Sequence, residues 1–112
     1  MADLQSLMAV GGVMAAFKFS SSGELEESKT KDESEFTDTG LDLISHVCVA
    51  NASIATMQAR GWENMTGMKG FYPIKGFTMV GFDWTVISSN EYAVIMPNTD
   101  VDYEAAYAAL NV

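Results

Sequence analysis

The residues that decide the fold are 32–61, DESEFTDTGLDLISHVCVANASIATMQARG. Thr30 lies just before this stretch and Glu33 lies within it, and the two have the spacing of a capping box. In a capping box a hydroxyl and a carboxylate satisfy backbone N–H groups at a helix start. Arg60 and Gly61 are typical of the last turn of a helix and of the residue that follows it. The stretch therefore predicts one long helix from Asp32 to Gly61.

Apolar side chains lie on two sides of this predicted helix. At intervals of about 100° per residue they form two stripes roughly 140° apart. The first stripe is Leu43, Val47, Ala50, Ile54 and Met57, and the second is Leu41, Ile44, Cys48, Ala52, Ala55 and Ala59. The broad polar face is Asp42, Ser45, His46, Ser53, Thr56 and Arg60. A helix that packs on one sheet and exposes its opposite face to water needs only one apolar stripe. Either this helix is sandwiched inside its own domain, or one stripe meets another subunit, and for so short a chain we favour a dimer.

Size and charge limit the classes of function. The chain has 112 residues, 48% of them hydrophobic, which predicts a single folded domain over residues 1–112. Its net charge of −9 argues against nucleic acids and anionic membrane surfaces as partners. Eight of the fifteen acids lie between Glu24 and Asp42. Such a run is either a docking surface for a basic partner or a solvated face.

The termini and the cysteine content favour a cytoplasmic protein. The single cysteine excludes an internal disulfide framework. The first residues, 1–4, lack the basic and apolar regions of a secretory signal. The longest uncharged apolar stretch, 8–17, is far shorter than the roughly 20 residues that a membrane span needs.

The rest of the chain predicts short elements on either side of the long helix. A short amphipathic helix around Leu4–Met8 ends at Gly11, and the second strand is polar, as expected near a sheet edge. Residues 65–74 are consistent with either a loop or an irregular strand. The predicted strands are 13–19, 24–28, 76–82, 84–89 and 91–96, and Tyr103, Ala106, Tyr107 and Leu110 predict a final helix. This order is typical of an α+β protein with helices packed on an antiparallel sheet.

This order of elements is accompanied by recognisable local sequences. They are Leu4-Gln5-Ser6-Leu7, Gly12-Val13, Ser22-Gly23, Asn51-Ala52 and Tyr92-Ala93-Val94-Ile95-Met96. Together they resemble the roadblock/dynein-light-chain family, whose fold is related to that of profilin. The segment from Met57-Gln58-Ala59 to Gly61 and the pair Lys75-Gly76 are similar to an uncharacterised prokaryotic branch. The resemblance covers essentially the whole chain, although residues 65–74 depart from the simplest family pattern.

The resemblance implies a fold and a mode of assembly. The fold would be α-β-β-α-β-β-β-α, with a central antiparallel five-stranded sheet, the long helix on one face and the terminal helices on the other. In the family, long helices pair across a two-fold axis and the sheet often continues into the partner. The residues expected at a dimer interface are Leu43, Val47, Cys48, Ala50, Ala52, Ile54, Ala55, Met57, Phe77 and Met79.

Catalytic and metal-binding residues are not indicated. His46 and Cys48 would point about 200° apart on a helix, so they cannot form a nucleophile–base pair within one chain. Acid–base catalysis by paired carboxyl groups requires burial, and both candidate pairs, Glu24 with Glu26 and Asp100 with Asp102, lie in polar contexts. We therefore expect no enzyme activity, metal or cofactor.

Residues 60–77 contain the strongest candidate for recognition of another molecule. Lys-Gly-Phe occurs twice, and after Lys31 every basic residue of the chain lies here. Positive charge, aromatic area and glycine suit binding of an acidic protein or a small anion. In the alternative interpretation the aromatics fold onto the core while the lysines offset the acids. The candidates are Arg60, Trp62, Lys69, Phe71, Tyr72 and Lys75.

The sequence thus predicts a non-enzymatic homodimeric scaffold or adaptor that binds a larger protein. By resemblance, the partner would be a small GTPase or a heterodisulfide-reductase-like assembly of sulfur metabolism. The alternative is a small-molecule sensor or carrier with a pocket between the long helix and the sheet.

Overall fold

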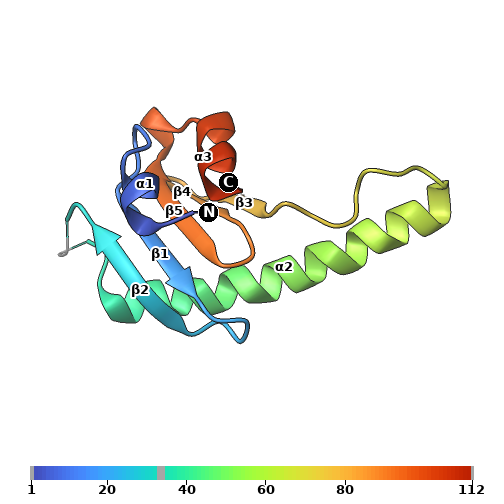
Figure 1. Ribbon diagram of the computed structural model, residues 1–112, viewed down its shortest axis with the longest axis horizontal. Helices are drawn as coiled ribbons and strands as arrows, with labels where there is room; N and C mark the ends of the chain where they lie inside the picture. The colour runs from blue at the N-terminus through green and yellow to red at the C-terminus, as the bar shows by residue number, and fades with distance from the viewer. Residues whose placement is uncertain (1, 33–34, 112) are drawn as a thin grey trace.

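The computed structural model describes residues 2–32 and 35–111 (Figure 1). The elements in chain order are α1 (Leu4–Met8), β1 (Ala15–Phe19), β2 (Leu25–Thr30), α2 (Asp38–Thr66), β3 (Phe77–Val80), β4 (Trp84–Ser88), β5 (Tyr92–Pro97), the 3-10 turn η1 (Asn98–Asp100) and α3 (Tyr103–Leu110). The predicted α+β order is confirmed.

The strands form one five-stranded antiparallel sheet. Their spatial order is β2-β1-β5-β4-β3, so β2 and β3 are the two edges. The central strands β1, β4 and β5 are almost wholly buried, which explains why their sequences are apolar at nearly every position. The polar strand β2 lies at an edge, as predicted.

Each face of the sheet is covered by different helices. Side chains alternate between the faces, so Ala16 of β1 packs with α1 and α3 whereas its neighbours Ala15 and Phe17 pack beneath α2. On β4, Ile87 and Val86 divide in the same way. Both predicted layers are therefore present, with the terminal helices on one side and the long helix on the other (Figure 1).

The long helix begins and ends later than the sequence predicts. Thr37 caps it, with its Oγ1 accepting the Gly40 N–H at 3.2 Å, and Gly67 ends it at a φ of 71°. The predicted capping box is wrong because Thr30 belongs to β2, opposite Ala15; its other member, Glu33, lies outside the described residues. Gly61 lies inside the helix.

The other boundaries differ from the predicted ones by a few residues. Strands β1, β3 and β5 are shorter or begin later than expected, and β2 extends to Thr30. Of residues 65–74, for which the sequence allows a loop or a strand, 65 and 66 are the last residues of α2. The others belong to a loop, 67–76, without regular secondary structure. Ser45, expected on the polar face of α2, is fully buried, with its hydroxyl donating to the Leu41 carbonyl oxygen at 2.8 Å.

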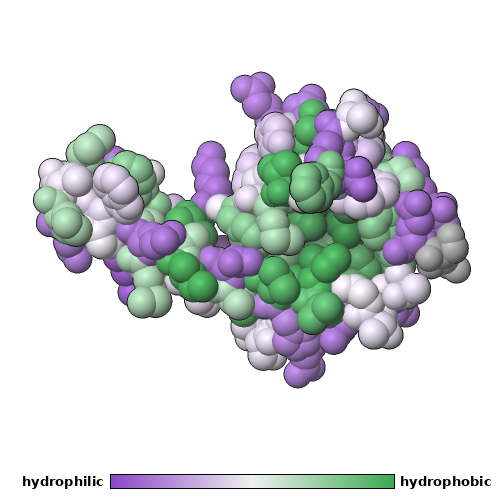
Figure 2. Space-filling view, turned by 180° about the vertical axis from the view of Figure 1, so that it is seen from behind, coloured by the Kyte–Doolittle hydropathy of each residue, from purple (hydrophilic) through white to green (hydrophobic). Residues whose placement is uncertain are grey.

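The end of α2 projects beyond the sheet. The helix runs under the sheet and continues past its edge, and the loop that follows returns to β3 (Figure 1). This projection makes the molecule 46 Å long against 30 and 26 Å in the other directions. In the space-filling view a narrow neck joins the projecting end to the body (Figure 2).

Among the described residues, one helix has the length and apolar composition that crossing a membrane requires, and it is α2. Length and composition do not separate a membrane helix from a helix that packs on a sheet. Leu41, Ser45 and Cys48 of α2 are buried against the body.

Candidate protein-interaction surface

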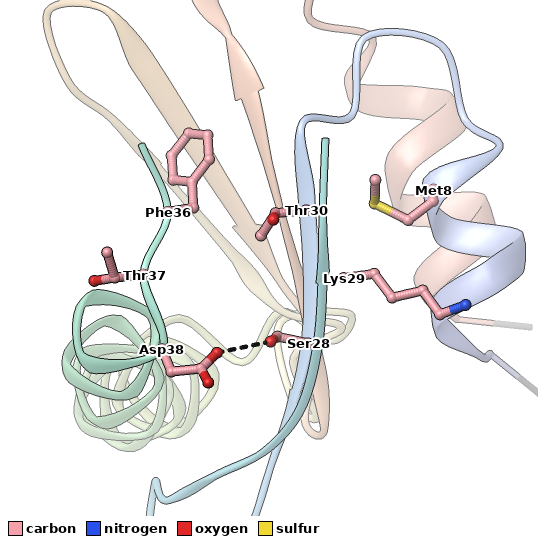
Figure 3. Close-up of a pocket in the computed structure, with 7 residues that line it drawn as sticks. All are labelled: Met8, Ser28, Lys29, Thr30, Phe36, Thr37 and Asp38. Carbon is pink, nitrogen blue, oxygen red and sulfur yellow. Dashed lines mark hydrogen bonds between the residues drawn. The ribbon is translucent and has the colours of Figure 1, made fainter. Parts of the chain in front are cut away.

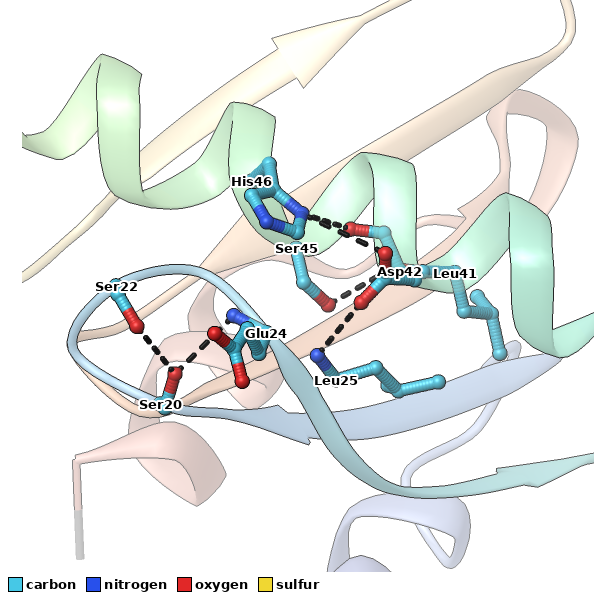
Figure 4. A network of polar contacts seen from close by, with 8 residues as sticks. All are labelled: Ser20, Ser22, Glu24, Leu25, Leu41, Asp42, Ser45 and His46. Carbon is cyan, nitrogen blue, oxygen red and sulfur yellow. Dashed lines mark hydrogen bonds and ion pairs between the residues drawn. The ribbon is translucent and has the colours of Figure 1, made fainter.

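His46 is part of a polar contact that ties α2 to β2 (Figure 4). Its Nδ1 lies 2.8 Å from the Asp42 carbonyl oxygen and 3.7 Å from Asp42 Oδ2. The other carboxylate oxygen of Asp42 accepts the Leu25 N–H at 2.9 Å. The β1–β2 turn also rests on this point, because a Cβ at Gly23 would lie 2.9 Å from His46 Cα. The geometry gives His46 a structural role.

Cys48 is buried beneath α2 and faces Ser88 of β4. Burial raises the pKa of its thiol to about 11, and a hydrogen bond with Ser88 acts in the opposite direction. Because the thiolate is the reactive form, this cysteine is a poor nucleophile at neutral pH. It also lies inside the protomer, away from the outer surface of α2.

The carboxylate pairs have no special environment. Glu24, just before β2, and Glu26, on β2, are exposed, and Asp100 and Asp102 are exposed near α3. Asp102 caps α3 by accepting the Ala105 N–H at 3.0 Å. Within residues 2–32 and 35–111, no group of three or more His, Cys, Asp or Glu side chains could hold a metal ion.

A hollow of about 650 Å³ lies beside β2 and the start of α2 (Figure 3). Its lining residues do not converge on one point. Phe36 and Asp38 lie on one side of β2, whereas Met8 and Lys29 lie on the other (Figure 3). Asp38 already accepts a hydrogen bond from the Ser28 hydroxyl at 3.2 Å. The hollow therefore has the character of a surface depression at the sheet edge.

The two apolar stripes of α2 have different surroundings. The second stripe faces the body, where Leu41, Cys48 and Ala59 are buried. The first stripe faces outward, with Leu43 67% and Met57 73% exposed. Its members are spaced alternately by four and three residues, which is the spacing of a coiled-coil seam. The predicted pair of stripes is confirmed, and only one of them is covered within the chain.

The edge strand β3 adds to this outward surface. Its inner neighbour is β4, and its other side is open. Val80 is 60% exposed, and Phe82 of the following turn is fully exposed. An open groove of about 270 Å³ runs between α2 and β3, lined by Asn51, Ile54, Ala55, Gln58, Phe77, Thr78 and Met79. The outward stripe and the free edge therefore form one continuous surface.

The projecting end of the molecule, which we call the arm, comprises residues 60–75. Glu63 organises it: its Oε2 accepts the N–H groups of Gly70, Phe71 and Tyr72 at 3.0, 3.0 and 3.1 Å. The Tyr72 N–H is the largest cause lowering the pKa of the Glu63 carboxyl, and the other two N–H groups and the Lys69 charge act in the same direction. Glu63 is not among the residues predicted from the sequence; its only signal there is an acid in the last turns of a helix before a glycine-rich loop.

Aromatic contacts complete the arm. Arg60 donates to the Tyr72 hydroxyl at 2.7 Å, and its guanidinium lies 4.5 Å from the centroid of that ring. The rings of Trp62 and Phe71 lie 6.1 Å apart. The structure thus brings together four of the six predicted binding residues, and Lys69 lies where its charge acts on Glu63.

The aromatics of the arm fold onto the end of α2 and remain partly open to solvent. Trp62 is 60% and Met65 89% exposed, and Met68, Phe71 and Tyr72 are exposed as well. The alternative in which these side chains fill the core is therefore wrong. Large apolar side chains gathered at a projecting tip are typical of an interaction surface.

The comparisons with known proteins agree with this architecture. A family profile described as "Uncharacterized conserved protein (DUF2173)" matches residues 3–112. The chain belongs to this family. No curated protein matches the sequence.

Two solved structures are similar to this DUF2173 chain. The roadblock/LC7 domain from Streptomyces avermitilis is 12% identical, with a TM-score of 0.63, and the match covers 96% of this chain and 84% of that one. A structure described as MglB with tetrameric arrangement is also 12% identical, with a TM-score of 0.67, and the match covers 95% and 75%. At this identity the likeness shows the fold, and the expected roadblock fold is confirmed.

Proposed function

We propose that this DUF2173 chain forms a homodimer that acts as a non-enzymatic scaffold or adaptor for a larger protein. The observation that carries the proposal is the continuous apolar surface formed by the outward stripe of α2 and the free edge of β3. A soluble protomer rarely leaves an extended apolar seam and an uncharged sheet edge uncovered.

The spacing of the outward stripe favours antiparallel pairing of two α2 helices. With a two-fold axis at Ala50, Leu43 of one helix is level with Met57 of the other, and Val47 is level with Ser53, next to Ile54. The small side chain of Ala50 lets the two helices approach closely at the axis. Pairing of the two β3 edges, with Phe77 and Met79 at the junction, would satisfy backbone groups that are otherwise open. Cys48 is buried within the protomer, so the proposed contact omits it.

The larger partner is the part of the proposal that rests on resemblance. It would be a small GTPase or a heterodisulfide-reductase-like assembly, bound at the acidic edge β2 or at the arm. The net charge of −9 favours a protein partner over nucleic acid or an anionic membrane, and we place the complex in the cytoplasm.

The experiment that tests the dimer is light scattering over a dilution series. We expect the wild type to have the mass of a dimer, and Ile54→Glu to be a monomer with an unchanged circular dichroism spectrum. Ala108→Glu is the matched control, since Ala108 is an exposed helical residue of α3, on the other face of the sheet. A wild type that stays monomeric at the highest concentration would overturn the proposal.

The groove between α2 and β3 supports the second candidate, a small-molecule sensor or carrier. The groove includes Phe77 and Met79, as that hypothesis expects, but it is open along its length rather than enclosed. Thermal shift assays with metabolites distinguish the two functions. A carrier gains stability with a metabolite while it stays a monomer, whereas a scaffold gains stability with protein concentration.

A further inference from the structure

We propose that the arm binds a second copy of this chain, lying against the acidic start of the partner's α2. This inference rests on the proposed homodimer and extends it, since each protomer would reach past the central contact to hold the other. The candidate binding residues of the arm would then serve self-association, which leaves the acidic edge β2 for an outside partner.

The arm is an exposed surface with a fixed shape. Glu63 holds three consecutive amides of the loop, and Arg60 holds the Tyr72 ring. These contacts link the loop to α2 and present Met65 and Trp62 outward. A preorganised apolar surface loses less conformational freedom on binding than a flexible segment does.

The charges of the arm and of the rest of the chain are complementary within a pair of chains. The arm contains three basic residues and one acid, a net charge of +2. The whole chain carries −9, so the rest of the protomer carries −11. Acids gather at the start of α2, where Glu35 and Asp38 are exposed and Asp42 is half-buried. The arm is thus a part of the chain whose charge is opposite to the net charge of a second copy.

The register of the proposed pair of helices also favours this contact. The outward stripe centres the antiparallel helices on Ala50. Arg60 lies ten residues after this centre, and Gly40 lies ten residues before it. Arg60 of one protomer is therefore level with the partner's Gly40, between its two helical acids Asp38 and Asp42. The arm begins where the acidic start of the partner's helix lies.

Both the charged and the apolar side chains of the arm can contact the partner in this arrangement. The long side chains of Arg60 and Lys69 can approach the partner's acids while Met65 and Trp62 cover its outward helix surface. In the same register Trp62 is level with the partner's Asp38 and Met65 with its Glu35, so that surface is the start of the partner's α2. Apolar contact surrounded by opposite charges is the usual anatomy of a specific interface.

The test compares dimer dissociation constants, measured by analytical ultracentrifugation. We expect Met65→Ser to raise the Kd by about tenfold, because the side chain touches only the partner. Tyr103→Ser is the control: Tyr103 is also an exposed apolar residue but lies on α3, on the other face of the sheet. Its Kd should equal that of the wild type.

A charge-exchange pair tests the complementarity directly. Lys69→Glu should raise the Kd several-fold, and adding Asp38→Lys should bring it back toward the wild-type value, because the opposite charges are restored with their positions exchanged. A Kd that stays within twofold of wild type for both Met65→Ser and Lys69→Glu would overturn the inference.

A cysteine crosslink distinguishes the absence of the arm contact from the absence of the dimer itself. Thr39 and Gly61 are level across the proposed two-fold axis, and within one helix they are about 33 Å apart by the rise per residue. The variant with Thr39→Cys and Gly61→Cys can therefore form disulfides only between chains. If it crosslinks while the arm variants bind normally, the dimer stands and the arm inference fails. If no wild-type dimer exists, both fail.

Discussion

The two ends of α2 are parts of one helix but differ in what surrounds them. In the first half, Leu41, Ser45 and Cys48 are buried against the sheet. Beyond Ala59 no described residue of the helix is buried, although Trp62 and Met65 are as apolar as their counterparts. Hydrophobic patterning therefore predicts that a surface will be covered, but it does not say whether the cover comes from the same chain.

The two ends are also held in different ways. The start of the helix is fixed by many packed side chains and by Asp42, which reaches the backbone of β2. The arm depends on few contacts, chiefly the three amides bound by Glu63. We expect the stability of the first region to be insensitive to single polar groups, and the order of the arm to depend on one carboxylate.

Two leucines that lie two residues apart, on different sides of α2, give the sharpest contrast between covered and uncovered surface. Leu41→Ala should lower the free energy of unfolding by about 2–5 kcal/mol, since it leaves a cavity in the core. Leu43→Ala should change it by about 0.5 kcal/mol or less, because this side chain is exposed. Urea unfolding at a concentration where the chain is monomeric measures both. Equal losses would mean that Leu43 is covered within the protomer.

Gly76, which joins the arm to β3, and Gly61, in the helical part of the arm, differ in the space around them. A Cβ at Gly76 would lie 1.8 Å from the Ser88 carbonyl oxygen, whereas none of the surrounding atoms lies within 4 Å of one at Gly61. Gly76→Ala should therefore destabilise the fold by about 1–3 kcal/mol. Gly61→Ala should stabilise it by about 0.5–1 kcal/mol through helix propensity. Thermal unfolding distinguishes them, and a neutral Gly76→Ala would contradict the close approach of β3 to β4.

Acid should loosen the arm before it unfolds the body. The folded arm lowers the pKa of Glu63 below its ordinary value of 4.5. Its contribution to order is thus complete above pH 4.5 and is lost as the pH falls through the lower, folded value. NMR shifts of the Gly70, Phe71 and Tyr72 amides should report this transition. In Glu63→Gln the transition should be absent, and an unchanged titration in that variant would assign it to another group.

The smallest response of the native protein is expected at Cys48, when a thiol reagent is added. With a thiol pKa of about 11, native Cys48 should react very slowly with a thiol reagent at pH 8, and rapidly after unfolding in urea. The thiol of free cysteine under the same conditions is the control. Fast labelling of the native protein would show that the contact between α2 and β4 opens readily.

Most of the layered architecture could be predicted from the sequence. Strand periodicity, the two stripes and the polar second strand each correspond to a feature of the fold. The boundaries of α2 could not be predicted, because local signals occur twice. Both Thr30 and Thr37 have the hydroxyl of a helix cap, and both Gly61 and Gly67 are possible stops. Pairing of Thr30 with Ala15 decides between the first two, and that contact joins distant residues.

The candidate site was only partly predictable. Charge and composition located Arg60, Trp62 and Tyr72 as a group, since they are unusual residues in an acidic chain. Glu63 could not be recognised, because its role depends on the backbone direction of the loop it binds. Ser45 was placed on the wrong surface for a related reason: its hydroxyl is satisfied by the helix carbonyl of Leu41, so it can be buried.

The unequal edges of the sheet have a consequence for how far assembly can proceed. Strand β3 carries no charged side chain, whereas β2 carries Glu26, Glu27 and Lys29 along its exposed side. Charged strands resist edge-to-edge addition. Two copies that meet at β3 would leave only charged strands at the ends of the joined sheet. Edge-to-edge growth of the sheet would then stop at the dimer. A chain with one open edge strand could pair in this way without polymerising into fibres.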